Sequence, residues 1–201
     1  LIISMVDMDE IKFNSILNKS ISRYGFTETI LAIVYPFLDK VGILWMAGDI
    51  NPAQEHFVSN LIRQKIITAV DGFSHVFNPD ARKFLLFLPE GEWHELGLLF
   101  SLYLLKEAGH EVLYLGQSVP YSDVLATGSA RPFDHILLSA TIPQPEFDFV
   151  TYLKDLGGAY PDKKILYYAA FMKFEPDYFG KNYIQLRTIN DLKIFLDKLA
   201  G

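Results

Sequence analysis

The stretch from Pro89 to Gly97 brings together residue types that can hold a transition metal. A neutral imidazole such as that of His94 is a good ligand, and a carboxylate on its other ring nitrogen fixes the tautomer and raises its basicity. Glu92 lies two residues before His94 and can take that supporting role. Gly97 lets the backbone approach a bulky ligand closely. The pattern predicts a metal-ligating histidine loop, with an ordinary polar loop residue as the alternative.

Composition limits the kind of protein. The 201 residues carry a net charge of −6, which argues against a large basic surface for nucleic acid. Cysteine is absent, so disulfides and thiolate metal sites are excluded and we expect a cytoplasmic protein. We expect no membrane-spanning helix, because the most apolar stretch, 30–47, is interrupted by Pro36, Asp39 and Lys40. A chain that starts at Leu1 is compatible with a fragment of a longer protein.

The first part of the chain predicts helices. Apolar residues recur at helical spacing over Asp9–Tyr24 and again over Glu28–Met46, where Pro36 should introduce a kink. A third helix should begin after Asn51 and run to about residue 70, because Asn51 and Gln54 have the spacing of a capping box. We therefore expect a four-helix-type bundle over residues 1–76.

After a Gly- and Pro-containing linker, the pattern changes to short apolar runs separated by helical stretches. The runs that we expect to be strands are Phe84–Leu88, Val112–Leu115, Ile136–Leu138, Ile165–Tyr168 and Tyr183–Leu186. The stretches that we expect to be helical are Glu95–Ala108, Tyr121–Ala130, Pro145–Leu156 and Asn190–Leu199, whereas Phe174–Lys181 should be mostly loop. Strands that alternate with helices predict a Rossmann-like, flavodoxin-like domain with a parallel five-stranded sheet over residues 77–201. The histidine loop then falls at the carboxyl end of a strand, where such sheets bind ligands.

The histidine loop also resembles a known motif. Glu92-x-His94-x-x-Gly97 is similar to the Asp-x-His-x-x-Gly motif of cobalamin-binding domains. The resemblance implies that His94 displaces the dimethylbenzimidazole base and coordinates cobalt from below. Glu92 would support it in place of the family's aspartate, which keeps the charge and adds one methylene.

Two further positions correspond to motifs of the same family. Ser139-Ala140-Thr141 stands where the family has Ser-x-Leu or Ser-x-Thr after the third strand. The resemblance implies that Ser139 and Thr141 line the slot for the displaced nucleotide tail; capping of a strand end is the alternative. Ala169-Ala170 stands where the family has Gly-Gly, so two added methyl groups bear on how well the tail is held.

The helical part carries a second resemblance. Trp45, followed after nine residues by Glu55-His56, is similar to the Trp-x9-Glu-His motif of CarH-type photoreceptors, which are MerR-type transcriptional regulators that sense light through adenosylcobalamin. The resemblance implies that Trp45 and Glu55 cap the upper face of the cofactor and that His56 helps to hold that pocket. A core tryptophan and a helix-start carboxylate are the alternatives. Met46 occupies a place where light-sensing members can carry a second cobalt-binding histidine.

Together these features predict the sensor region of a CarH-like regulator, which is not an enzyme and binds cobalamin, most readily adenosylcobalamin. We expect a homodimer or homotetramer that contacts no membrane, and DNA binding through an N-terminal helix-turn-helix domain absent from these residues. The alternatives are a corrinoid carrier protein of a methyltransferase system and a related module that has lost cobalamin binding. His75, His110 and His135 are expected to be surface or structural residues.

Overall fold

The computed structural model describes residues 1–73, 78–143, 147–172 and 178–200. The chain divides into two compact units, Leu1–Gly72 and Phe73–Gly201. His75, the start of the helix predicted from Pro145, and residues 174–177 of the region predicted as loop lie outside the described residues.

The first unit is built from helices. They are α1 (Ile2–Val6), α2 (Glu10–Tyr24), α3 (Phe26–Thr29), the π-helical segment η1 (Ile30–Val34), α4 (Tyr35–Ala47) and α5 (Pro52–Asp71). The three predicted helices are confirmed, and the short helix α1 was not anticipated. Asp9 caps α2 by accepting a hydrogen bond from the backbone N of Lys12, 2.9 Å away.

The segments α3, η1 and α4 continue one another from Phe26 to Ala47. Pro36 has no N–H to donate to the preceding turn, and the wider π-helical turn lies immediately before it, at the place where a kink was predicted. By length and composition alone this helix could cross a membrane, which the interrupted apolar pattern did not suggest. Its Ile30, Val34, Phe37 and Val41 are buried within the bundle.

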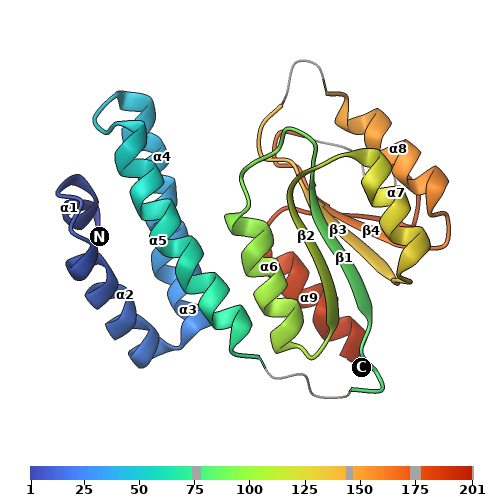
Figure 1. Ribbon diagram of the computed structural model, residues 1–201, viewed down its shortest axis with the longest axis horizontal. Coiled ribbons are helices and arrows are strands. Elements are labelled where there is room, and N and C mark those ends of the chain that lie inside the picture. Colours follow the sequence, from blue (N-terminus) through green and yellow to red (C-terminus); the bar gives the residue numbers. More distant parts are fainter. Residues whose placement is uncertain (74–77, 144–146, 173–177, 201) are drawn as a thin grey trace. The chain divides into compact units, whose positions relative to one another are not determined.

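The turn between α4 and α5 is tightly specified. Gly48 ends α4 in the left-handed conformation, with φ of 79°, which residues with a side chain rarely adopt. The predicted capping box is confirmed, because Asn51 Oδ1 accepts from Gln54 N and Gln54 Oε1 accepts from Asn51 N, each at 3.0 Å. The end of α4 and the start of α5 therefore lie at the same end of the bundle (Figure 1).

The second unit contains a parallel sheet. Among the described residues its five strands are β1 (Lys83–Pro89), β2 (Glu111–Val119), β3 (His135–Ser139), β4 (Lys164–Tyr168) and β5 (Tyr183–Leu186). Their spatial order is β2-β1-β3-β4-β5, and every neighbouring pair is parallel. This is the flavodoxin-like order, so the predicted fold class is confirmed.

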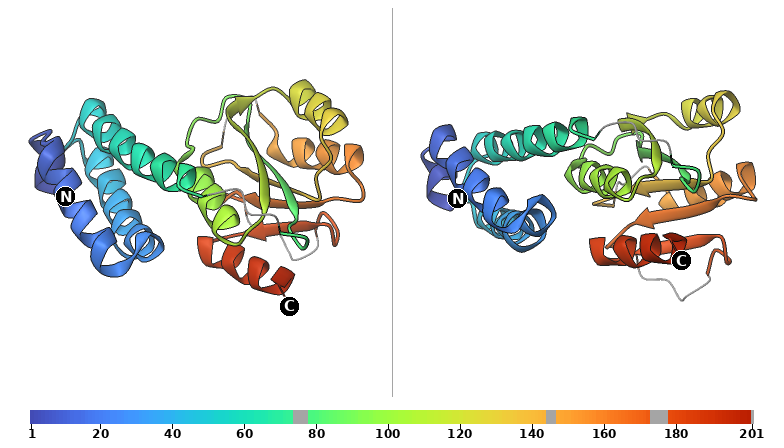
Figure 2. Two further views of the ribbon diagram at one scale, coloured as in Figure 1. Left: turned by 60° about the horizontal axis from the view of Figure 1, so that its bottom comes forward. Right: turned by 90° about the horizontal axis from the view of Figure 1, so that it is seen from below.

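Helices cover both faces of the sheet. They are α6 (Leu96–Glu107), α7 (Tyr121–Ala130), α8 (Phe149–Ala159) and α9 (Ile189–Ala200). Helices α6 and α9 lie on one face and α7 and α8 on the other (Figure 2). After the exposed Lys83, all of β1 is buried, as expected for a strand covered on both faces.

Two boundaries of the second unit differ from the predictions by four residues, more than the others do. Strand β2 runs to Val119 rather than Leu115, and its pairing with β1 slips twice, between Leu86 and Phe87 and between Phe87 and Pro89. Helix α8 begins at Phe149 rather than Pro145. Asp148 caps it, because Asp148 Oδ1 accepts hydrogen bonds from the backbone N of Val150 and of Thr151. The strand order switches direction at β1 and β3, and the loops that follow these two strands carry the candidate site.

Candidate functional site

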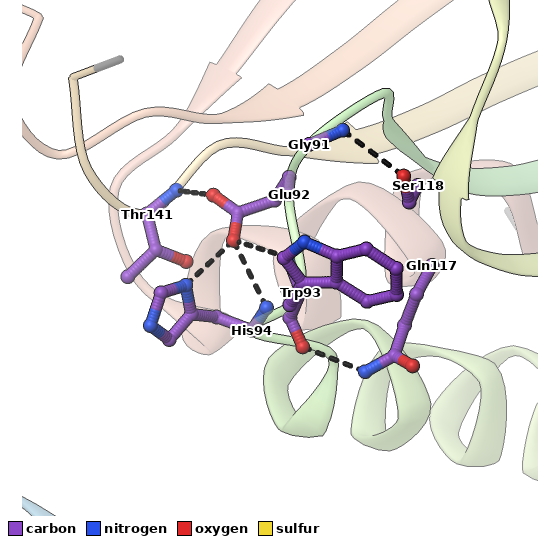
Figure 3. A network of polar contacts seen from close by, with 7 residues as sticks. All are labelled: Gly91, Glu92, Trp93, His94, Gln117, Ser118 and Thr141. Carbon is purple, nitrogen blue, oxygen red and sulfur yellow. Dashed lines mark hydrogen bonds and ion pairs between the residues drawn. The ribbon is translucent and has the colours of Figure 1, made fainter.

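His94 lies in the loop that joins β1 to α6, and its ring is oriented by Glu92. The Nδ1 atom lies 2.6 Å from Glu92 Oε1 (Figure 3). An ionised carboxylate only accepts hydrogen bonds, so Nδ1 carries the proton and the ring's lone pair is on Nε2. The His94 side chain is 56% exposed, whereas that of Glu92 is 2% exposed. The arrangement presents a basic imidazole nitrogen on a buried carboxylate support.

Glu92 is held on both of its oxygens. Oε1 also accepts from the backbone N of Trp93 and of His94, each at 2.9 Å, and Oε2 accepts from the backbone N of Thr141 at 2.6 Å. Burial raises the pKa of Glu92, but the hydrogen bonds from His94 and Thr141 outweigh it and lower the pKa to about 2. Glu92 is therefore ionised at neutral pH, and it ties the loop after β1 to the loop after β3.

The far end of β2 also contacts the histidine loop, through residues that the sequence pattern did not single out. Gly91 N donates to Ser118 Oγ at 3.1 Å, and Ser118 N donates to the carbonyl oxygen of Glu92 at 3.1 Å. Gln117 Nε2 donates to the carbonyl oxygen of Trp93 at 2.7 Å (Figure 3). The one sequence signal is Gly116, the glycine directly after the run predicted as a strand, because a glycine at such a place is typical of a bulge.

One more contact holds the loop where it enters the helix. Tyr114 Oη, also on β2, donates to Glu95 Oε2 at 3.0 Å, and Glu95 is buried. Sequence reasoning missed this pair as well, since a tyrosine in a strand is ordinarily a packing residue.

Gly97 lies in the first turn of α6, and a Cβ built there would meet no protein atom within 4 Å. Its φ is not positive, so neither backbone strain nor packing within the described residues requires glycine. A glycine in a helix costs about 1 kcal/mol relative to alanine. The open space at Gly97 is therefore a place where a bulky ligand can approach the backbone.

Ser139 and Thr141 lie where β3 ends. Ser139 is half-buried and pairs with Tyr168 in the register of β3 with β4, whereas Thr141 is exposed. Between them Ala140 is buried in the core on the α7 and α8 face, and its N donates to the carbonyl oxygen of Tyr168 at 2.8 Å. The two hydroxyl residues therefore differ in environment: Thr141 joins the Glu92 network through its backbone, and Ser139 lies one strand position earlier.

The two alanines after β4 are not equivalent. Ala169 is fully buried in the same core cluster as Ala140 and Tyr167, whereas Ala170 is exposed in the turn that follows. The carbonyl oxygen of Ala169 accepts from Gln185 Nε2 at 3.2 Å. The methyl group of Ala169 therefore fills the core, and only that of Ala170 projects from the surface.

At the end of the bundle, Trp45 is 55% exposed and Met46 is 76% exposed. The alternative that Trp45 is an ordinary core residue is therefore wrong. An indole exposed to this extent is available to stack on a flat ligand.

Glu55 and His56 lie in the first turn of α5, at the same end of the bundle. His56 Nδ1 lies 2.7 Å from Glu55 Oε2, and Ser59 Oγ donates to Glu55 Oε1. The Glu55 carboxylate is thus oriented by two neighbours on its own helix. His56 itself is largely exposed, and its ring is oriented by this contact with Glu55.

Within the described ranges, no three or more His, Cys, Asp or Glu side chains come together in a way that could hold a metal ion. A bare divalent ion requires four or more protein or water ligands.

Comparisons with known proteins bear on both units. The family model described as the B12 binding domain matches residues 1–68. The chain is 29% identical, over 154 residues, to the HTH-type transcriptional repressor CarH of Myxococcus xanthus, which covers 76% of this chain and 50% of the repressor. It is 32% identical, over 121 residues, to the HTH-type transcriptional repressor CarA of the same organism, covering 60% of this chain and 39% of the repressor. The first unit therefore matches the B12 binding domain model, and the chain is similar to these two repressors over part of its length.

This confirms the predicted resemblance to CarH-type regulators. The chain spans about half the length, or less, of the curated relatives that it matches. Its fold is that of the monomethylamine corrinoid protein of Methanosarcina barkeri, with a TM-score of 0.71 over 97% of this chain and 94% of that one. At 14% identity this likeness concerns the fold alone.

Proposed function

We propose that this chain is the cobalamin-binding sensor and oligomerisation module of a transcriptional regulator, and that it holds adenosylcobalamin base-off with His94 as the lower cobalt ligand. The observation that carries the proposal is the 2.6 Å contact between His94 Nδ1 and the buried Glu92 carboxylate, which leaves the lone pair on Nε2. The location supports it too, because the loop follows β1 at the point where the strand order switches direction.

The residues around His94 fit such a cofactor. A single imidazole suits a metal that already has the four equatorial nitrogens of a corrin ring, and cobalamin supplies, when bound, a cobalt–carbon bond whose breaking can act as a signal. Gly97 leaves space beside the loop, and Ser139 and Thr141 would contact the displaced nucleotide tail. Ala169 is buried, so of the two alanines it is Ala170 that would narrow the tail's path.

The bundle would supply the upper side of the site. Trp45 would stack on the adenosyl group, and Glu55 would accept hydrogen bonds from ribose hydroxyls, with His56 holding the Glu55 carboxylate. The exposed indole and the oriented carboxylate support this part of the proposal. An adenosyl group, rather than a smaller upper ligand, offers the area that an indole can cover.

The module would act as a switch and not as an enzyme. A cofactor contacted by residues of both units can bias their packing, and through it a homodimer or homotetramer. DNA would be bound by a helix-turn-helix domain outside these residues, and the whole protein would work in the cytoplasm. The names of the relatives, both HTH-type transcriptional repressors, support this assignment.

Light is the signal that the resemblance to CarH-type photoreceptors suggests. Met46 bears on whether a second protein ligand would bind cobalt after illumination. A thioether binds oxidised cobalt more weakly than an imidazole does, so Met46 would not lock the illuminated form as a histidine can. The light response would then consist of loss of the adenosyl group and its contacts with Trp45. Absorption spectra of the reconstituted protein before and after green light would show whether illumination changes the bound cofactor.

The ligand assignment is tested by mixing the protein with adenosylcobalamin under red light. The wild-type protein should give a base-off, His-on spectrum, and His94→Ala should abolish it. An unchanged spectrum in that variant would refute the role of His94. Isothermal titration with several cobalamins tests the alternative that this module has lost cobalamin binding. Tight binding of any cobalamin would exclude that alternative.

The second candidate is a corrinoid carrier of a methyltransferase system, and the shared fold with the monomethylamine corrinoid protein favours it. A methyl carrier needs an upper face that partner enzymes can reach. The exposed Trp45, at the same end of the bundle as Glu55, suits a covered adenosyl group better. Methyl transfer from the loaded protein to a thiol or folate acceptor, with partner enzymes present, would decide for the carrier.

A further inference from the structure

The last residues of the edge strand β2 depart from regular pairing just where they pass the histidine loop. Leu86 pairs with Tyr114, Phe87 with Gly116 and Pro89 with Val119, so β2 contains extra residues relative to β1. These bulges re-aim the side chains that follow them. Ser118 adopts a positive φ of 50°, which is unfavourable for a residue with a Cβ and persists only where the surroundings impose it.

The bulged segment makes its hydrogen bonds to three consecutive residues directly before His94. Ser118 Oγ accepts from Gly91 N and Ser118 N donates to the Glu92 carbonyl, each at 3.1 Å. Gln117 Nε2 donates to the Trp93 carbonyl at 2.7 Å (Figure 3). We call this set of contacts, from Gln117 and Ser118 to residues 91–93, the β2 clamp. Its contacts to the loop are independent of those that Glu92 makes to Thr141.

We propose that Gln117 and Ser118 are positioning residues, which hold the backbone before His94 so that its imidazole presents Nε2 at the angle a cobalt ligand requires. This inference rests on the proposed role of His94. The Glu92 carboxylate fixes the rotation of the ring through Nδ1 and ties the loop to the loop after β3 through Thr141 N, but among the hydrogen bonds of the described residues it makes none to β2, the strand on the other side of β1. The β2 clamp anchors that loop to the sheet.

The division of labour has a measurable consequence. Partners that orient a metal ligand typically change metal affinity by about 10- to 100-fold when they are removed. Losing the β2 clamp should leave Glu92 and His94 paired but let the loop shift. Cobalamin should then bind more weakly, and a smaller fraction of the bound cobalamin should be coordinated by His94.

The test uses Gln117→Leu, which keeps the approximate shape of the side chain and removes the donor. Its matched control is Asn182→Leu. Asn182 lies directly before β5, and its Nδ2 also donates to a backbone carbonyl at 2.7 Å, that of Pro161 in the loop before β4. The readouts are the dissociation constant by isothermal titration, the His-on fraction from the absorption spectrum, and the unfolding temperature without ligand. We expect about tenfold weaker binding and a reduced His-on fraction for Gln117→Leu only.

A second pair of variants separates the hydroxyl of Ser118 from its backbone conformation. Ser118→Gly removes the hydroxyl and relieves the positive φ, whereas Ser118→Ala removes the hydroxyl and keeps the unfavourable conformation. Both should lower the His-on fraction if the hydrogen bond to Gly91 positions the loop. Only Ser118→Ala should also lower the unfolding temperature.

The outcomes distinguish this inference from the function on which it rests. If wild-type protein gives no His-on spectrum, the role of His94 fails and the inference fails with it. If the wild type is His-on and Gln117→Leu and both Ser118 variants match Asn182→Leu in affinity and His-on fraction, the positioning role is overturned while the ligand assignment stands. Weaker binding with an unchanged His-on fraction would likewise assign the β2 clamp a merely structural role.

Discussion

The histidine loop after β1 and the turn between α4 and α5 carry the two proposed halves of the site, and they are built very differently. In the loop, the Glu92 carboxylate is buried and accepts four hydrogen bonds, two of them from backbone N–H groups of the loop itself. At the turn, Trp45 is exposed, and Glu55 is oriented by His56 and Ser59 of its own helix. In the proposed site the loop would therefore act as a preformed ligand, whereas the end of the bundle would be a surface that the cofactor covers.

Because of this difference, substitutions in the two regions should affect protein stability and cobalamin binding to different extents. A residue of the loop is part of the protein's own structure, so its loss should cost folding energy as well as affinity. A residue at the end of the bundle makes few contacts that folding depends on, so its loss should affect binding alone.

The largest effect is expected for Glu92→Ala. Without the carboxylate, the backbone N–H groups of Trp93, His94 and Thr141 lose an acceptor in partly buried hydrogen bonds, and each such loss costs about 1 kcal/mol. The free energy of unfolding in urea should fall by about 3 kcal/mol. A loss below about 1 kcal/mol would mean that water replaces the carboxylate and that the loop is not rigidly preformed.

Trp45→Ala should show the opposite behaviour. Because the indole is exposed, the free energy of unfolding should change by less than about 0.5 kcal/mol. Affinity for adenosylcobalamin should fall by about tenfold, the usual scale for losing one aromatic contact, while affinity for hydroxocobalamin should hardly change. Equal losses for both cobalamins would remove Trp45 from the upper face, and Ile43→Ala, another exposed residue of α4, serves as the matched control.

A second histidine of the sheet sharpens the contrast with His94. His135 begins β3, is 7% exposed, lies against Phe84 and Phe195, and has no hydrogen-bond partner on either ring nitrogen in the described structure. Burial lowers the pKa of His135 to about 4. Below about pH 6.5 the His135 imidazole is therefore protonated in the unfolded chain but stays neutral in the native state. The free energy of unfolding should consequently fall as the pH drops from 6.5 toward 4.

His135→Leu should remove that dependence. At neutral pH the variant should be more stable by about 1 kcal/mol, since an unsatisfied buried imidazole is replaced by an apolar side chain of similar volume. Urea unfolding at pH 7.5 and at pH 5 should show the gap widening at the lower pH. A parallel fall of stability in both proteins would place the acid sensitivity elsewhere.

The smallest effects are expected at the two alanines. Ala169→Gly should lower the unfolding free energy by about 1 kcal/mol, because its methyl fills the core, whereas Ala170→Gly should cost only a few tenths of that. Only Ala170→Gly should tighten binding of complete cobalamin relative to cobinamide, which lacks the nucleotide tail. For each variant, the measurement is the ratio of the dissociation constants for cobalamin and cobinamide. A change in this ratio for Ala169→Gly alone would mean that Ala169, and not Ala170, narrows the path of the nucleotide tail.

Local signals explain which parts could be read from the sequence. The Asn51 capping box, the Gly48 stop and the five apolar runs are local patterns, and the structure contains each of them. The spacing of Glu92, His94 and Gly97 identified the loop because all its members are close in the chain.

The contacts across the chain could not be read in this way. The Glu92–Thr141 hydrogen bond joins residues 49 positions apart, and its formation depends on how far β1 and β3 extend side by side. Gln117 and Ser118 reach the loop only because two bulges displace the end of β2. The burial of Ala169 against the exposure of Ala170 depends on where β4 ends, which no local pattern marks.

The central claim is that the Nε2 atom of His94 binds the cobalt of cobalamin. Electron paramagnetic resonance of the protein-bound Co(II) form tests it directly, because a nitrogen ligand splits the cobalt lines. Protein labelled with ¹⁵N-histidine should change that splitting from the three-line pattern of ¹⁴N to the two-line pattern of ¹⁵N, and His94→Ala should lose the effect. A three-line pattern that is the same in labelled and unlabelled protein would show that the cofactor's own base is bound, and would contradict the account.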